Sequence, residues 1–145
     1  MQVKIFLGES GVYVIAFFTG YILVNLTIEN QKISPYFIAN LLWYPSFEVL
    51  YSIIRKAFGK KTPFQPDTSH LHHLVFFFLK KKFKIGFSNS LSAIIINFYN
   101  LVMMLYASKN ISNTTFQSTI ILCNIIIYCL IYKVLAKVKK KQISK

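Results

Sequence analysis

Long apolar blocks separated by short polar segments make up most of this chain of 145 residues. Residues 11–28, 85–108 and 110–132 contain no charged side chain, and residues 33–54 contain only Glu48. Each block offers the roughly 20 apolar residues that a helix needs to cross a bilayer. Because an open chain of this size can satisfy its backbone groups in lipid only as helices, the pattern predicts an all-α integral membrane protein. We expect one membrane domain, 1–145, with four transmembrane helices at about 11–28, 34–54, 87–107 and 116–134 and a loop, 55–86, that carries a short helix.

The basic residues indicate how these helices are oriented. Only 14% of the residues are charged, compared with about 25% in soluble domains. The net charge is nevertheless +13. Fifteen of the seventeen Lys and Arg lie before the first span, between the second and third spans or after the fourth, whereas the other two connections carry only Lys32 and Lys109. By the positive-inside rule, the 55–86 loop and both termini are predicted to be cytoplasmic in a multi-pass inner (plasma) membrane protein. Charge in these places attracts anionic lipid and leaves no soluble basic domain for nucleic acid.

One carboxylate, Glu48, lies inside a predicted span. A charged side chain at a helix centre costs about 2.5–3.5 kcal/mol on insertion scales, so it is expected to face a polar interior. Arg55 follows seven residues later, which puts both side chains on one face of the helix, about 10 Å apart. Two interpretations stay open: a pair that orients this span beside Pro45, or a role in shaping a site at the cytoplasmic face.

A glycine-flanked carboxylate, Gly8-Glu9-Ser10-Gly11, begins the first predicted span. Glycine lets another group approach the backbone closely, and the free N–H groups at a helix N-terminus attract phosphate. A carboxylate beside them suits Mg²⁺, which binds a few carboxylates together with phosphate oxygens. The alternative is a helix cap, in which Glu9 or Ser10 accepts from first-turn N–H groups. The spacing alone favours the cap.

All three histidines of the chain, His70, His72 and His73, lie in the loop between the second and third spans. Asp67 is predicted to cap a helix through them, with His70 and His73 on one face and His72 pointing away. Zinc would need three or four ligands, and no cysteine lies nearby. Donor imidazoles near Arg55 suit a diphosphate or nucleotide better. The alternative is a polar loop whose histidines have no role.

Three sequence elements occur in a fixed order: FLGESG (6–11), LLWYPSFEVLYSIIRK (41–56) and TPFQPDTSHLHHL (62–74). They resemble the F-x-G-D-x-G, P-x-x-D and P-D-x-x-H-x-H-H motifs of the polyprenyl-phosphate N-acetylhexosamine-1-phosphate transferases, glycosyltransferase family 4. The resemblance covers nearly the whole chain, and its histidine motif is the most specific part. It corresponds to the C-terminal part of such an enzyme, the last four of about ten or eleven spans.

The resemblance implies transfer of a sugar-1-phosphate from a UDP-sugar to a polyprenyl phosphate, with release of UMP, in the synthesis of cell-envelope glycans such as cell wall or lipopolysaccharide. It implies Mg²⁺ as the cofactor, with Glu9 at the place of a catalytic, metal-binding aspartate. The residues that it implies for the substrate side are His70, His72, His73, Asp67 and Arg55.

The chain departs from the family pattern at several positions. Glu9 replaces an aspartate, Thr68 replaces a common arginine, and Leu74 replaces a common basic residue. The family's paired aspartates are absent, so we expect the chain alone to be inactive. Its expected partners are the two substrates, membrane lipid, and a missing N-terminal half or a second copy of the chain. The alternative is a non-catalytic four-span membrane protein, or a truncated pseudo-enzyme, acting as an accessory subunit.

Overall fold

A computed structural model describes residues 8–59, 69–83 and 87–143, except the side chains of Glu9, of 82–83 and of 140–143. Its elements are helical in every described segment, which confirms the all-α fold. They are α1 (Gly8–Glu29), α2 (Pro35–Leu41), α3 (Trp43–Phe58), α4 (Leu71–Phe83), α5 (Ser88–Ala107), the 3-10 turn η1 (Ser108–Asn110) and α6 (Thr114–Ile143).

Three helices, α1, α5 and α6, are long and apolar enough to cross a membrane. A fourth crossing results if α2 and α3 together make one broken span. The chain is therefore a multi-pass membrane protein, and its described residues offer three or four spans. The last helix, α6, extends beyond the predicted 116–134 span and ends at Ile143.

The second predicted span is not one continuous helix. The axes of α2 and α3 differ by 75°, and the chain breaks between them at Leu42. Pro45 explains the position of the break, because proline has no N–H to offer the carbonyl four residues earlier and its ring clashes with that carbonyl. That carbonyl belongs to Leu41, the last residue of α2. The span expected at about 34–54 therefore consists of two helices joined at a bend.

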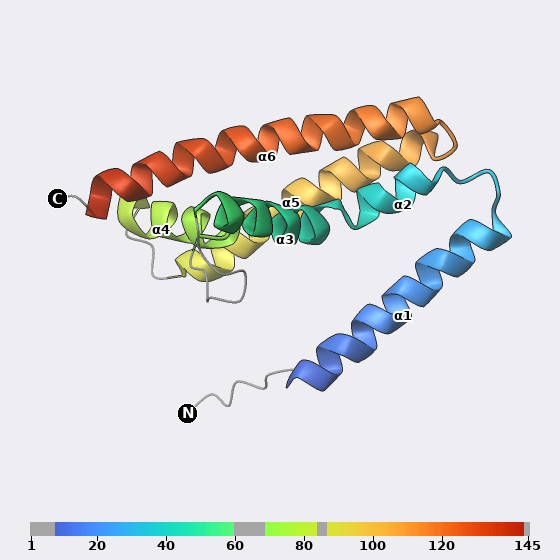
Figure 1. Ribbon diagram of the computed structural model, residues 1–145, viewed down its shortest axis with the longest axis horizontal. Helices are drawn as coiled ribbons and strands as arrows, with labels where there is room; N and C mark the ends of the chain where they lie inside the picture. The colour runs from blue at the N-terminus through green and yellow to red at the C-terminus, as the bar shows by residue number, and fades with distance from the viewer. Residues whose placement is uncertain (1–7, 60–68, 84–86, 144–145) are drawn as a thin grey trace.

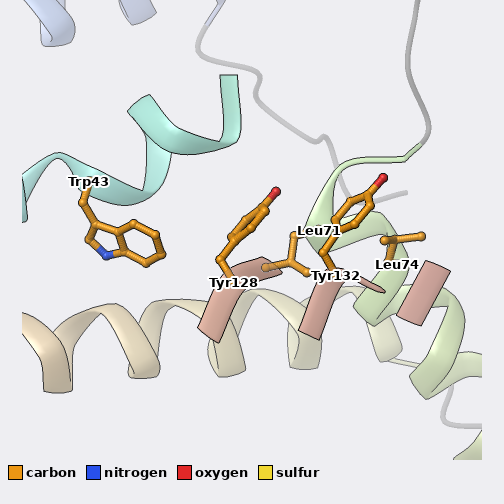
Figure 2. Packing of buried hydrophobic residues seen from close by; sticks show 5 residues of the cluster. All are labelled: Trp43, Leu71, Leu74, Tyr128 and Tyr132. Carbon is orange, nitrogen blue, oxygen red and sulfur yellow. The ribbon is translucent and has the colours of Figure 1, made fainter. Parts of the chain in front are cut away.

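Aromatic side chains fill the core between α3, α4 and α6. The buried residues of this cluster are Trp43, Leu71, Leu74, Tyr128 and Tyr132 (Figure 2). The Tyr128 ring lies at its centre, with ring centroids 5.0 Å from Phe47 and 5.2 Å from Tyr51. Edge-to-face aromatic contacts of this kind each contribute about 0.5–1.5 kcal/mol beyond the area that they bury. They hold the bent half-helix α3 and the loop helix α4 against α6.

Amides join the helices at the opposite end of the bundle. Gln117 is fully buried and donates from Nε2 to the carbonyls of Ala107 and Asn110 at 2.8 and 2.9 Å. Asn40 donates from Nδ2 to the side-chain and main-chain oxygens of Gln117 at 2.8 and 3.0 Å. Inside a bilayer, the hydrophobic effect does not drive helices together, because lipid tails are as apolar as the helix surfaces. Side-chain hydrogen bonds between helices contribute to their association instead. They fix α2 to α6 at the turn between α5 and α6.

The first helix stands apart from the others. In Figure 1, α1 approaches the bundle only near α2 and diverges from it toward the N-terminus. None of its apolar window is buried inside the structure, so its surface is available to lipid or to other helices. Gly8, at its start, has φ +70°, a backbone conformation that other residues adopt only with strain.

Candidate functional site

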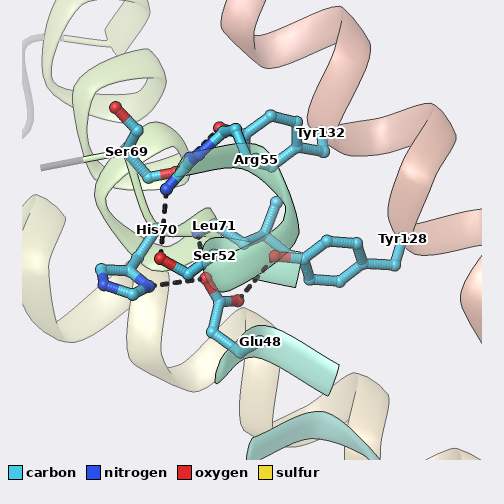
Figure 3. A network of polar contacts seen from close by, with 8 residues as sticks. All are labelled: Glu48, Ser52, Arg55, Ser69, His70, Leu71, Tyr128 and Tyr132. Carbon is cyan, nitrogen blue, oxygen red and sulfur yellow. Dashed lines mark hydrogen bonds and ion pairs between the residues drawn. The ribbon is translucent and has the colours of Figure 1, made fainter. Parts of the chain in front are cut away.

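Glu48 connects three helices at the start of the histidine helix. This carboxylate is only 9% exposed, and its Oε1 accepts from the main-chain N–H of Leu71 at 2.9 Å. The same oxygen lies 3.0 Å from Nδ1 of His70, while Oε2 accepts from the hydroxyl of Tyr128 at 2.9 Å (Figure 3). A buried carboxylate is stable only when its lone pairs are used in this way. Glu48 on α3 thus ties α4 to α6.

Glu48 also binds the N-terminus of α4. α4 begins at Leu71, and the carbonyl of His70 accepts from the N–H of Leu74 at 3.1 Å, so His70 occupies the N-cap position. The N–H of Leu71 is one of the first-turn donors that the helix itself leaves unpaired. A carboxylate there is favoured by the hydrogen bond and by the positive end of the helix dipole. The prediction that the helix runs through His70 is wrong, and Asp67, its predicted cap, lies outside the described residues.

Arg55 holds the same segment from one side. Its Nη1 donates to the carbonyl of Ser69 at 2.7 Å and to the hydroxyl of Tyr132, and its Nη2 donates to Oγ of Ser52 at 3.3 Å. Its guanidinium also lies 5.5 Å from the centre of the Tyr132 ring, a cation–π contact. Glu48 and Arg55 therefore both bind residues 69–71 from α3. This geometry favours the interpretation that the pair shapes the loop.

The three imidazole rings form one cluster. The ring centroids of His72 and His73 are 4.2 Å apart, those of His70 and His72 are 5.7 Å apart, and those of His70 and His73 are 6.4 Å apart. The prediction that His72 points away from the other two is wrong. It assumed that all three residues are helical, whereas His70 precedes the first helical residue, which lets its ring stack on that of His72.

The environment of His72 disfavours its charged form. Burial lowers the pKa of His72 below its ordinary 6.5, and the neighbouring His73 and His70 lower it further, although Glu48 acts in the opposite direction. His72 also lines a pocket of about 320 Å³ between α3, α4 and α5, together with Tyr44, Asn89, Ser92 and Asn97. Ala93 and Ile96 complete the lining, so this space combines hydroxyls, amides and an imidazole with a larger apolar surface.

The predicted metal site is not assembled by the described residues. No group of three or more His, Cys, Asp or Glu side chains within 8–59, 69–83 and 87–143 can hold a metal ion. Glu48, the carboxylate beside the histidines, already accepts three hydrogen bonds. Glu9 belongs to the first turn of α1, and its side chain is outside the described part of the chain. The N-terminal end of α1 lies away from α4 in Figure 1. The residues described here do not by themselves fit Mg²⁺.

Two tyrosines of the site were missed by the sequence analysis. Tyr128 and Tyr132 come from α6 and bond Glu48 and Arg55 respectively. A signal was present, because hydroxyl-bearing residues four apart in an otherwise apolar span share one helix face. Their partners lie 77 and 80 residues earlier in the chain.

The chain is similar to several curated bacterial proteins. One is the undecaprenyl-phosphate alpha-N-acetylglucosaminyl 1-phosphate transferase of Thermotoga maritima, 32% identical over 71 residues, which are 49% of this chain and 23% of that protein. A probable undecaprenyl-phosphate N-acetylglucosaminyl 1-phosphate transferase of Bacillus subtilis is 30% identical over 115 residues, 71% of this chain and 31% of that protein. The Escherichia coli K12 transferase is 30% identical over 73 residues, 50% of this chain and 20% of that protein.

The matches span only part of those proteins. The chain covers between 20% and 31% of the length of these three relatives. No protein-family model matches the chain, and no solved structure matches it significantly. The resemblance inferred from the three motifs is nevertheless confirmed: about half or more of this chain is similar to undecaprenyl-phosphate N-acetylglucosaminyl 1-phosphate transferases.

Proposed function

We propose that this chain forms the diphosphate-binding part of a membrane transferase. The reaction moves a sugar-1-phosphate from a UDP-sugar to a polyprenyl phosphate, releases UMP, and serves cell-envelope glycan synthesis. The observation that carries the proposal is the histidine cluster: three imidazoles with centroids 4.2–6.4 Å apart, in a segment held by two side chains of α3. The names of the relatives support the reaction class.

The proposed role of the histidines is to donate to the phosphate oxygens. Hydrogen bonds to charged groups contribute about 1.5–3 kcal/mol each, and imidazolium groups add charge that complements a diphosphate. Arg55 is a predicted substrate contact, and its bond to the carbonyl of Ser69 supports a second role in holding the histidine segment in place. Asp67 stays a prediction from the motif alone.

Mg²⁺ is the proposed cofactor. When bound, such an ion neutralises a diphosphate and stabilises the charge of the leaving group. Glu9 is the predicted carboxylate of that site, by its place in the FLGESG element. Since the described residues do not form a set of ligands around it, the remaining ligands are proposed to come from the family's other motifs, on another part of a longer chain or on a partner.

The membrane arrangement follows the charge asymmetry. We propose that the loop and the termini face the cytoplasm, where UDP-sugars are found, because fifteen of seventeen basic residues lie on that side. The LVFFFL stretch (74–79) belongs to α4, and we propose that it lies at the membrane interface. The apolar faces of the spanning helices then offer a surface for the polyprenyl chain.

Binding of UDP to the whole chain in lipid nanodiscs tests this proposal. The expected result is a phosphorus NMR shift and broadening of UDP that are lost when His70, His72 and His73 are all replaced by alanine. Lys109→Gln, which removes a positive charge from the other connection, is the matched control and should bind UDP normally. Binding that is equal in the triple variant and the unaltered chain would overturn the phosphate role.

Turnover is the complementary measurement. We expect no UMP release from the 145-residue chain with Mg²⁺, a UDP-sugar and undecaprenyl phosphate, because several carboxylates are needed around the ion. If the chain neither binds UDP nor turns over, the non-catalytic accessory role is the better account. Robust turnover by the chain alone would show that the assignment of the missing ligands is wrong.

A further inference from the structure

We propose that Glu48 is a positioning residue for His70, holding the imidazole with Nδ1 as the donor and Nε2 as the atom presented to the ligand. This inference rests on the proposed function for the identity of the ligand, a diphosphate, but its structural part stands on the contacts of Glu48 alone. Glu48 stands at the acidic position of the P-x-x-D element, a position to which the resemblance above gives no substrate or metal role.

The first step is the direction of the hydrogen bond between the two side chains. Oε1 of Glu48 accepts from the N–H of Leu71 at 2.9 Å, and a main-chain N–H can only donate. The same oxygen lies 3.0 Å from Nδ1 of His70. With the N-terminal end of α4 beside it, the carboxylate is favoured in its charged form, which accepts. The proton of this contact therefore belongs to Nδ1.

The second step is what this leaves at the other ring nitrogen. In a neutral imidazole one nitrogen donates and the other accepts, so a protonated Nδ1 leaves a lone pair on Nε2. When an anion binds, Nε2 can take up a proton and donate to it, while the carboxylate at Nδ1 stabilises the resulting imidazolium. The proton comes from solvent, and no bond other than N–H is formed.

The third step is rigidity. The other oxygen of Glu48 accepts from Tyr128 at 2.9 Å, so the carboxylate is held from α6 as well as from α4 (Figure 3). Among the described residues, the charged and titratable groups around His70 include Glu48 with its partner Tyr128, the rings of His72 and His73, and Arg55, which bonds the adjacent Ser69. Among the three histidines, His70 is the one whose ring nitrogen lies within hydrogen-bond distance of a described carboxylate. It is therefore the imidazole whose orientation a described carboxylate fixes.

Nitrogen NMR of the ¹⁵N-histidine-labelled chain in nanodiscs tests the inference directly, because the chain contains only three histidines. The ¹⁵N signal that disappears in the His70→Gln variant is that of His70. At a pH where His70 is neutral, the expected spectrum has its proton on Nδ1, the less common tautomer of free histidine. Glu48→Gln should shift the signal to the Nε2–H tautomer, and Glu48→Asp should restore part of the Nδ1–H form. Tyr99→Phe, which removes a partly buried tyrosine hydrogen bond to Asn124, is the control and should leave the tautomer unchanged.

UDP then serves as the probe of the ligand. Glu48→Gln is expected to weaken UDP binding by about tenfold or more, the loss of one charge-assisted hydrogen bond. Two results would overturn the inference: a neutral His70 with its proton on Nε2 in the unaltered chain, or a tautomer that does not change in Glu48→Gln. The first result is obtained with the unaltered chain, so it does not depend on whether a variant folds. If the tautomer depends on Glu48 but UDP does not bind the unaltered chain, the proposed ligand is wrong while the positioning of His70 stands.

Discussion

Arg55 and Ser69 are joined by a 2.7 Å hydrogen bond from Nη1 to the main-chain carbonyl, across fourteen residues of chain. The bond holds Ser69, two residues before the start of α4, against the C-terminal part of α3. Glu48, two turns earlier on α3, binds the next two residues, His70 and Leu71. One face of a single half-helix therefore holds the entry to α4 at two points.

Arg55→Lys is expected to loosen this entry. Lysine keeps the charge but lacks the planar fork that reaches Ser69, Tyr132 and Ser52 together. We expect a loss of stability of about 1–3 kcal/mol, the cost of leaving partly buried partners unpaired. Thermal unfolding of the purified chain in detergent measures it. Lys56→Arg, a charge-conserving exchange at the next residue, is a suitable comparison. Equal melting temperatures for Arg55→Lys and the unaltered chain would contradict the role given to Arg55.

Pro45→Ala is expected to straighten the bend between α2 and α3. Alanine restores an N–H that can bond the carbonyl of Leu41 and removes the ring that clashes with it. Spin labels at Tyr36 and Ile54 should therefore move apart, as measured by pulsed electron spin resonance. Pro35→Ala at the first position of α2, where proline needs no hydrogen bond, should leave the distance unchanged. An unchanged distance in Pro45→Ala would mean that packing against α6, not proline, sets the bend.

The membrane orientation is testable by labelling. Cysteines placed at Ser69 and Lys140 should be shielded from impermeant thiol reagents in intact cells, whereas one at Asn113 should react. The background chain should carry Cys123→Ala and Cys129→Ala, since both native thiols are free. The prediction follows from fifteen basic residues on one side against two on the other. Reaction at Ser69 from outside would separate the histidines from cytosolic nucleotides and end the transferase proposal.

The folded chain should become less stable as the pH falls, because His72 then takes up a proton. Its pKa is lowered in the folded chain, chiefly by burial, so the unfolded chain binds the proton more readily. The stabilisation from neutral His72 is therefore complete above the ordinary pKa of 6.5 and is lost progressively as the pH falls through the lowered value. Melting temperatures between pH 7.5 and 5 should decline less in His72→Gln than in the unaltered chain. Parallel declines would assign the pH dependence to other groups.

The sequence by itself determined the kind of protein and its helices. Uncharged apolar blocks predict spanning helices, because lipid offers no hydrogen-bond partners and the backbone N–H and C=O groups must therefore bond to one another within a helix. α1, α5 and α6 confirm that reading at 11–28, 87–107 and 116–134. The histidine motif likewise identified the segment of interest, because its residue types and spacing do not depend on the fold.

Only the tertiary structure decided how the site is built. Glu48 reaches residues 22 to 80 positions away, and Asn40 meets Gln117 across 77 residues. Local rules favoured a helix through His70, whereas the helix begins at Leu71 and a carboxylate from α3 binds its first N–H. The ring of His70 could then turn toward that of His72, since a residue outside the helix is free of its 3.6-residue spacing. Hydrogen bonds between distant segments depend on how helices pack, and helical periodicity within one segment carries no information about them.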